Sequence, residues 1–377
     1  MTITSLRITN FRNVEQAKLD PCSLGLNIIC GDNGSGKTSL LESIYYLGLG
    51  RSFRASSKGR LIRHDREKFS LFSHIVSDTD RQIPIGVEYD LSGATRLRVA
   101  ETESASITEL ASYLPIRLIN SQSQHLFESG PLYRRKFLDW GLFYQFEHFL
   151  SCWRQFERVL KQRNAVLRDR RSKNELQPWT DELIRYGLEL HALRSQYVVD
   201  LIPMIAEMTE SLLGFSHLQF HYSSGWATDF GSDQDYASVL ASAYVDELRA
   251  GHTLYGPHRA DLEITIDGVP VKHFLSRGQQ KLLICAMIIA QGKLLTSHTK
   301  KRLIYLVDDL PAELDLLSRR KLISLLSLQE TQIFITAIER EAICDLISDN
   351  PGVSMKVFHV KHGNVFDDTN LRSVISD

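Results

Sequence analysis

The stretch Gly31-Asp32-Asn33-Gly34-Ser35-Gly36-Lys37-Thr38 follows a short apolar run, Leu26 to Cys30, and precedes apolar residues at helical spacing, Leu40 to Leu47. It matches the pattern G-x-x-x-x-G-K-[ST] in full, in the strand, loop and helix setting that the pattern requires. The glycines let backbone N–H groups wrap phosphate oxygens, and the following helix adds its positive end. These eight residues therefore predict a nucleotide site, with Lys37 on the β- and γ-phosphates and the Thr38 hydroxyl on Mg²⁺.

Two adjacent carboxylates, Asp308 and Asp309, end a second apolar run, Leu303 to Val307. A buried strand that ends in acidic residues suits the metal-binding partner of a phosphate loop. We expect Asp308 to hold Mg²⁺ through water and Asp309 to orient the attacking water, so that Lys37, Asp308 and Asp309 are the candidate catalytic residues. The alternative is a solvated loop after a strand.

A third motif, Leu275-Ser276-Arg277-Gly278-Gln279-Gln280, opens a predicted helix that continues with apolar residues from Leu282 to Ile289. A serine hydroxyl and a glycine N–H at a helix N-terminus form a second anion site. One nucleotide does not need two such loops from one subunit. We therefore expect Ser276, Gly278 and Gln279 to cap the γ-phosphate of ATP that is held by a second copy of the chain.

The pattern along the 377 residues changes from strand to helix and back again. From about Tyr133 to Leu213, apolar residues recur at helical spacing with a break near Pro178, which predicts an antiparallel helical hairpin or, alternatively, a plain helical subdomain. Pro203 argues against a long unbroken coiled coil. The prediction is an α/β head split by a helical arm: 1–122 and 246–377 form the head, and 123–245 form the arm.

Composition limits the class of protein. The formal net charge is −1, so any contact with nucleic acid must come from local clusters of Lys and Arg. Two such clusters occur, within residues 51–68 and within residues 154–173, and each has a solvated surface as its alternative. The five cysteines form no C-x-x-C pair, and no signal segment or 20-residue apolar run is visible. We expect a reduced, cytoplasmic protein without a membrane partner.

The third motif resembles the ABC ATPase signature, and Glu313-Leu314-Asp315 resembles the D-loop of such proteins. An ABC-ATPase head interrupted by a helical arm resembles the SMC/Rad50-like branch. Within that branch the chain is similar to the RecF family, on stretches that keep their order over nearly the whole sequence. They include Phe11-Arg12-Asn13, Gly50-Arg51-Ser52-Phe53-Arg54, 130–140, 255–262, the signature and 307–315.

The resemblance implies further roles for single residues. It places Arg12 on an α- or β-phosphate, with an arginine on a strand surface as the alternative. It places Gln122, with Gln124 as its competitor, at Mg²⁺ and the γ-phosphate, and Thr336 near the γ-phosphate. Asp309 stands where ABC heads usually carry glutamate, which implies slow hydrolysis.

The resemblance also implies partners. These are an ATP-dependent homodimer, double-stranded, gapped or junction DNA, RecR and RecO, and a role in loading RecA. The competing functions are an ABC transporter ATPase and an SMC/Rad50-like tether. The long basic insertion argues against the first, and the short arm without a hook motif argues against the second.

Overall fold

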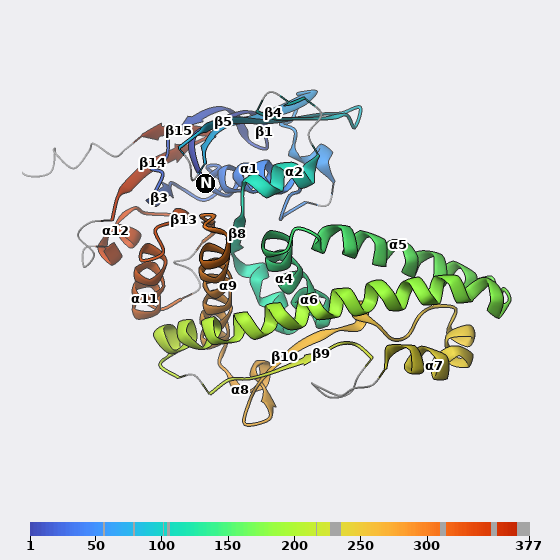
Figure 1. Ribbon diagram of the computed structural model, residues 1–377. Helices are drawn as coiled ribbons and strands as arrows, with labels where there is room; N and C mark the ends of the chain where they lie inside the picture. The colour runs from blue at the N-terminus through green and yellow to red at the C-terminus, as the bar shows by residue number, and fades with distance from the viewer. Residues whose placement is uncertain are drawn as a thin grey trace, which may run out of the picture. The chain divides into compact units, whose positions relative to one another are not determined.

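The structure is a computed structural model that describes residues 1–55, 57–77, 80–100, 102–103, 106–215, 217–226, 235–309, 314–347 and 353–367. It divides into two compact units. The first unit combines residues 1–123 with residues 295–377, and the second unit is residues 124–294 (Figure 1). The predicted α/β architecture with a helical insertion is therefore confirmed.

The first unit contains two six-stranded sheets. The antiparallel sheet has the order β2-β1-β4-β5-β6-β7, with β1 Thr2–Phe11, β2 Val14–Leu19, β4 Lys68–Val76, β5 Gln82–Asp90, β6 Thr95–Val99 and β7 Thr102–Glu103. The second sheet has the order β15-β14-β3-β13-β12-β8, with β3 Gly25–Cys30, β8 Ile116–Ile119, β12 Ile304–Val307, β13 Gln332–Ala337, β14 Met355–Lys361 and β15 Asn364–Asp367. All neighbours in the second sheet pair in parallel except β14 and β15.

Helix α1 (Lys37–Leu49) contacts strands of both sheets, and its apolar residues share one buried core with them. Strands β3, β12 and β13 are buried along almost their whole length, as parallel strands covered on both faces are. The remaining helices of this unit are η1 Lys58–Leu61, α2 Ile107–Tyr113, η2 Ser121–Gln124, α11 Leu316–Ser327 and α12 Glu341–Ile347. Gly31 ends β3 with φ 144°, and a Cβ there would lie 2.2 Å from the Val360 carbonyl oxygen of β14. Only glycine therefore allows β14 to run so close to the start of the phosphate loop.

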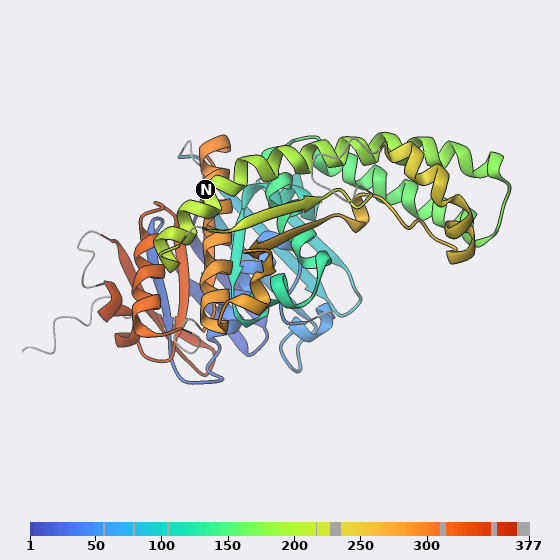
Figure 2. The same ribbon diagram turned by 90° about the horizontal axis from the view of Figure 1, so that it is seen from below.

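The second unit is built on a long antiparallel helix pair, α5 Phe149–Arg168 and α6 Lys173–Leu213, which lie side by side in both views (Figures 1 and 2). Its other elements are α3 His125–Glu128, α4 Pro131–Gln145, β9 Gln219–Ser223, α7 Tyr236–Ala250, η3 Pro257–Arg259, β10 Asp261–Ile266, β11 Val269–Pro270 and α8 Val271–Phe274. Asp267 and Gly268, both of positive φ, form the turn of a hairpin in which β10 and β11 pair in antiparallel fashion.

Two prolines lie within a continuous helix. The predicted break between two helices lies at 169–172 and not near Pro178, because α6 runs for 41 residues through both Pro178 and Pro203. Both prolines lie on the exposed side of the helix. Water can satisfy the carbonyl that each proline leaves without its usual donor, so the helix continues at these positions.

The unit boundaries differ from the expected ones of 122/123 and 245/246 and lie at 123/124 and 294/295. The second boundary lies later in the chain than expected because β10 pairs with β9. Helix α4 contacts β10 and helix α6 contacts β9, so both strands belong to the helical unit. Helix α9 (Arg277–Thr299) connects the two units and has a mean hydropathy of 1.3 over 18 residues. By length and composition alone it could cross a membrane. Because 72% of that window is buried, α9 is typical of a core helix instead.

A buried ion pair connects α5 and α7 in the second unit. Arg163 donates to Glu247 at 2.7 Å, and the two side chains are only 1% and 0% exposed. Arg163 also donates to the hydroxyls of Thr253 and Thr180, and Glu247 accepts the backbone N–H of Leu254. Arg163 is therefore a core residue, although its position in the second basic cluster had made it a candidate for DNA contact.

Replacing Glu247 by alanine leaves the Arg163 charge buried without its partner. We expect Glu247→Ala to lower the free energy of unfolding of the second unit by about 3–5 kcal/mol in urea titrations. Asp246→Ala is the control, because Asp246 forms an exposed pair with Arg249 and its loss should cost less than about 1 kcal/mol. Equal effects of the two changes would contradict a structural role for the buried pair.

Candidate nucleotide-binding site

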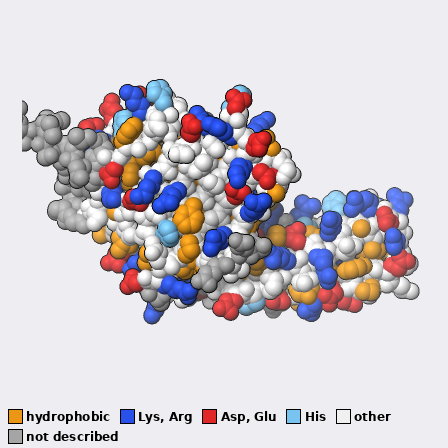
Figure 3. All heavy atoms as spheres, turned by 90° about the horizontal axis from the view of Figure 1, so that it is seen from above, with side chains coloured by type: hydrophobic (Ala, Val, Ile, Leu, Met, Phe, Trp, Pro, Cys, Tyr) orange, Lys and Arg blue, Asp and Glu red, His pale blue; other side chains and the backbone are white. Residues whose placement is uncertain are grey.

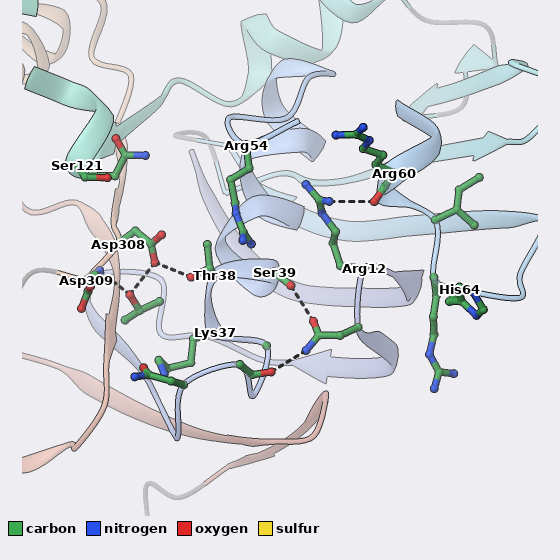
Figure 4. Close-up of a pocket in the computed structure, with 18 residues that line it drawn as sticks. Arg12, Lys37, Thr38, Ser39, Arg54, Arg60, His64, Ser121, Asp308 and Asp309 are labelled. Atoms are coloured by element: carbon green, nitrogen blue, oxygen red, sulfur yellow. Dashed lines mark hydrogen bonds between the residues drawn. The ribbon is translucent and has the colours of Figure 1, made fainter. Parts of the chain in front are cut away.

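A pocket of about 820 Å³ opens at the carboxyl ends of β3 and β12 (Figure 4). Residues of the first unit alone line it, and most of them are polar. They are Arg12, Asn13, Asn33, Gly34, Gly36, Lys37, Thr38, Ser39, Arg54, Arg60, Ile62, Arg63, His64, Asn120, Ser121, Asp308, Asp309 and Thr336. The edge of a parallel sheet where the strands end is the usual place for a nucleotide in such folds.

The phosphate loop is held open by its own contacts. Asn13 donates from Nδ2 to the Gly34 carbonyl at 3.2 Å, and its Oδ1 accepts the Ser39 hydroxyl at 2.8 Å. Gly36 has φ 123°, and a Cβ there would approach the Asn13 amide at 3.3 Å. The sequence offered Asn13 only as part of a family stretch, and the structure shows that Asn13 connects the loop to α1.

Two groups in the loop have the chemistry to receive phosphate. Lys37 donates from Nζ to the carbonyls of Gly31 and Asp32 at 2.5 and 2.9 Å. These acceptors are uncharged, so they hold the ammonium group beside the loop only weakly. Burial lowers the pKa of Lys37, and the carboxylates of Asp309, Asp32 and Asp308 oppose this shift. The Ser35 hydroxyl is buried and has no hydrogen-bond partner among the described residues. Phosphate oxygens would satisfy both groups.

The acidic edge of the pocket joins three neighbouring strand ends. Thr38 and Thr336 donate from Oγ1 to Oδ1 of Asp308 at 3.1 and 2.9 Å, and the Thr336 hydroxyl accepts the Asp309 N–H at 2.8 Å. Burial raises the pKa of Asp308, and the bonds from Thr336 and Thr38 oppose that shift. Asp309 is exposed, with φ 57°. Thr336 thus fixes both carboxylate residues, a role that its predicted γ-phosphate contact did not include.

Arg12 lines the pocket but is already anchored. Its Nε and Nη2 donate to both carboxylate oxygens of Glu42 at 2.9 and 2.8 Å, and its Nη1 donates to the Arg60 carbonyl. Glu42 is fully buried in α1. Sequence reasoning missed Glu42, although a lone carboxylate among the buried positions of α1 was a signal that could have drawn attention to it.

The first basic cluster is divided between the pocket and the surface. Arg54, Arg60 and Arg63 line the nucleotide pocket. Arg63 and Arg66 pair with Glu15, Lys68 pairs with Glu88, and Lys58 lies over the Tyr89 ring. The interpretation of residues 51–68 as DNA contacts stays a prediction.

The remaining predicted residues lie elsewhere. Gln122 is exposed on η2 and is not part of the pocket wall, where Asn120 and Ser121 lie instead. Its competitor Gln124 belongs to the second unit, as do the signature residues. Ser276 and Gln279 cap the start of α9 reciprocally: the Ser276 N–H donates to Gln279 Oε1 at 3.0 Å, and the Gln279 N–H donates to Ser276 Oγ at 3.3 Å. All four residues from Ser276 to Gln279 are exposed, which leaves this helix start accessible.

The expected D-loop lies partly outside the described residues, because Glu313 is not described. Asp315 caps α11 by accepting the Ser318 N–H at 2.8 Å. Leu314 is buried. This segment therefore shows a helix cap, and its relation to a nucleotide stays a prediction.

The second basic cluster keeps an exposed part. On α5, the exposed residues Arg154, Arg158, Lys161 and Arg168 are spaced four, three and seven apart, so they share one helix face. The last three border a shallow groove of about 560 Å³. Lys and Arg side chains recur along the arm in the space-filling view (Figure 3). We call Arg158, Lys161 and Arg168 the α5 stripe.

Comparisons with known proteins agree with this geometry. The family model "RecF/RecN/SMC N terminal domain" matches residues 2–362. The chain is 42% identical over 365 residues to the DNA replication and repair protein RecF of Shewanella frigidimarina, covering 97% of this chain and 99% of that one. It is 40% identical over 366 residues to RecF of Cellvibrio japonicus, again covering 97% and 99%.

Solved structures share the fold. "The recombination mediator protein RecF-ATPrS in RecFOR pathway" superposes with a TM-score of 0.84 at 23% identity, covering 97% of both chains. "The SmcHead bound to the C-winged helix domain of ScpA" superposes with a TM-score of 0.61 at 14% identity, covering 98% of both chains. The fold is thus that of an SMC-type ABC-ATPase head. With relatives at 40% identity over nearly its whole length, the chain belongs to the RecF family of DNA replication and repair proteins.

Proposed function

We propose that this chain is an ATP-operated switch that dimerises around ATP, binds gapped or junction DNA and hydrolyses ATP slowly. The observation that carries the proposal is the meeting of Lys37, Thr38 and Asp308 in one pocket, although Asp308 is 270 residues away from Thr38. Each of these groups has its established use in phosphate or metal binding, and the RecF relatives are DNA replication and repair proteins.

The residues present fit MgATP. The orphaned Ser35 hydroxyl and the Lys37 ammonium face the loop that would hold the phosphates. The Thr38 hydroxyl donates to the Asp308 carboxylate at 3.1 Å, so two oxygen groups that suit Mg²⁺ lie together beside the loop. Thr38 would hold Mg²⁺ directly and Asp308 would hold it through water, and the ion would neutralise charge on the β- and γ-phosphates when it is bound.

Asp309 is the residue that would orient the attacking water. The Thr336 hydroxyl fixes its backbone, and its side chain is exposed at the mouth of the pocket. Aspartate is one methylene shorter than the glutamate usual in ABC heads, so it reaches less far toward a water on the γ-phosphate. Slow turnover suits a switch that must persist in its ATP state while it is bound to DNA.

Dimerisation is supported by the start of α9. Ser276, Gly278 and Gln279 are exposed at the N-terminus of a 23-residue helix, and no carboxylate lies in its first turn. Such a terminus attracts anions. We propose that it caps the γ-phosphate of ATP in a second copy, so that ATP acts as the link between the two chains.

DNA binding is supported by the α5 stripe. Within the described residues, Arg158, Lys161 and Arg168 form no ion pair. They extend over about 15 Å of helix at 1.5 Å per residue, which suits contacts with successive phosphates of a DNA backbone. Such contacts position a protein without reading sequence. We further propose cytoplasmic action with RecR and RecO in loading RecA, in line with the RecFOR pathway named for the solved RecF.

Two substitutions separate ATP binding from dimerisation. We expect Lys37→Met to abolish both, because it removes the phosphate-facing charge. Ser276→Arg should keep ATP binding within about threefold, because Ser276 lies outside the pocket, but should abolish the dimer because the larger side chain does not fit between the helix start and the phosphate. Equilibrium titration with a fluorescent ATP analogue and sedimentation with ATP measure the two properties.

The control for Ser276→Arg is Ser242→Arg, which changes an exposed serine on α7. It should dimerise like the unmodified protein. An ATP-dependent dimer of Ser276→Arg, or a monomer of the unmodified protein at high concentration with ATP and DNA, would remove the capping proposal.

Replacing Arg158, Lys161 and Arg168 together by alanine should weaken binding to gapped duplex DNA while ATP affinity is retained. Loss of three phosphate contacts should reduce the slope of log K against log salt by about 3. Fluorescence anisotropy across a salt series measures this slope.

The matched control removes the same charge from paired residues. Arg171, Arg185 and Arg249 pair with Asp169, Glu182 and Asp246. If the triple alanine variant of these three arginines shows the same loss of slope, net charge and not the α5 stripe determines DNA affinity.

A further inference from the structure

Glu42 is an unusual residue for its position. It lies on α1 with 0% exposure, one turn beyond the phosphate loop, and it is the only carboxylate on this helix. A buried carboxylate is costly unless other groups compensate its charge. Its partners are the Arg12 guanidinium, through two nitrogens, and the Ser52 hydroxyl, which donates to Oε1.

From Glu42 one set of contacts runs through Arg12. The Arg12 N–H donates to the Leu61 carbonyl at 2.7 Å, and Nη1 donates to the Arg60 carbonyl at 2.9 Å. Arg12 has φ 56°, which is unfavourable for a residue with a side chain. The contacts with Glu42 and η1 compensate this cost and fix the guanidinium at the pocket wall.

A second set of contacts runs through Ser52. The Ser52 hydroxyl donates to Glu42 and accepts the N–H groups of Arg54 and Ala55 at 2.9 and 2.7 Å. This fixes the backbone from which the Arg54 side chain extends. In Figure 4 the Arg54 side chain points toward Thr38 and Asp308, the end of the pocket where the γ-phosphate of ATP would lie.

The two sets of contacts end in cations that line the same pocket. Within the described residues, Arg54 has no ion pair, although it lies close to Asp308. Ser52 fixes the backbone of Arg54, while the Arg54 side chain is exposed. Its guanidinium is therefore available for charge-assisted hydrogen bonds to an incoming anion. Its position near Thr38 and Asp308 favours the terminal phosphate over the first two.

We propose that Glu42 is a positioning residue that holds Arg12 directly and Arg54 through Ser52, and that Arg54 thereby makes the pocket select ATP over ADP. The inference rests on the proposed nucleotide site and adds the source of its selectivity. It assigns to Glu42 a role in binding, beyond its part in the packing of α1.

The test compares affinities for ATP and ADP, measured by calorimetry with Mg²⁺ in the full chain. Glu42→Gln should weaken ATP binding about tenfold to a hundredfold, because the charge-assisted bonds to Arg12 and Ser52 are lost. ADP binding should weaken less, because the loss at Arg12, expected on the α- or β-phosphate, affects both nucleotides, whereas the loss at Arg54 affects ATP alone. Ser52→Ala should lower the ATP preference through Arg54 alone. It retains the Arg12–Glu42 pair, so it remains informative if Glu42→Gln fails to fold.

The matched control is Ser43→Ala. Ser43 is buried beside Glu42 on α1, and its hydroxyl donates to the Leu40 carbonyl and not to the network. It should alter stability without altering the ratio of ATP to ADP affinity.

A double-mutant cycle of Ser52→Ala with Arg54→Ala tests the proposed order of contacts. If Ser52 acts through Arg54, its substitution should have no further effect once Arg54 is alanine. An unchanged ATP preference in both Glu42→Gln and Ser52→Ala, or a Ser52 effect that persists in Arg54→Ala, would overturn the inference. Nucleotide binding by the unmodified protein would in that case still support the proposed function, whereas its absence would remove both.

Discussion

The hydrogen bond from Thr38 to Asp308 depends on one constraint, the parallel pairing of β13 between β3 and β12. Ile335 pairs with Ile28 on one side and with Val307 on the other, so the phosphate loop, Thr336 and Asp308 emerge at one edge of the sheet. Parallel strands need long crossover connections, and here the connection between β8 and β12 includes the whole second unit. The site and the insertion are therefore two results of the same topology.

The meeting of these strand ends at one edge of the sheet also explains why the pocket contains both carboxylates and cations. Asp308 and Asp309 would repel each other and the phosphates if no cation were near them. Burial raises the pKa of Asp308, and the negative charge of Asp309 raises it further. Lys37, Arg12 and Arg54 face them from the phosphate loop, from the turn after β1 and from the loop after α1. The pocket is therefore a set of opposed charges held apart by hydrogen bonds to threonine and backbone groups.

Electrostatics are handled differently in the two units. In the first unit, cations pair with glutamates that are distant in sequence, as Arg63 and Arg66 do with Glu15, or they line the pocket. In the second, Arg163 is buried against Glu247 while its neighbours on α5 stay exposed. Basic residues that are close together in the sequence are thus divided by the fold among the core, the pocket and the surface.

The sequence by itself determined the phosphate loop, the acidic strand end, the signature and the division into head and helical insertion. These features are local, because glycine freedom, strand burial and helical spacing act within about ten residues. Tertiary structure decided the rest. It placed Arg12 on Glu42, moved Gln122 away from the pocket wall, buried Arg163 and let α6 pass through Pro178 and Pro203. Each of these outcomes depends on a partner distant in sequence or on which side of a helix meets water, and a linear pattern records neither.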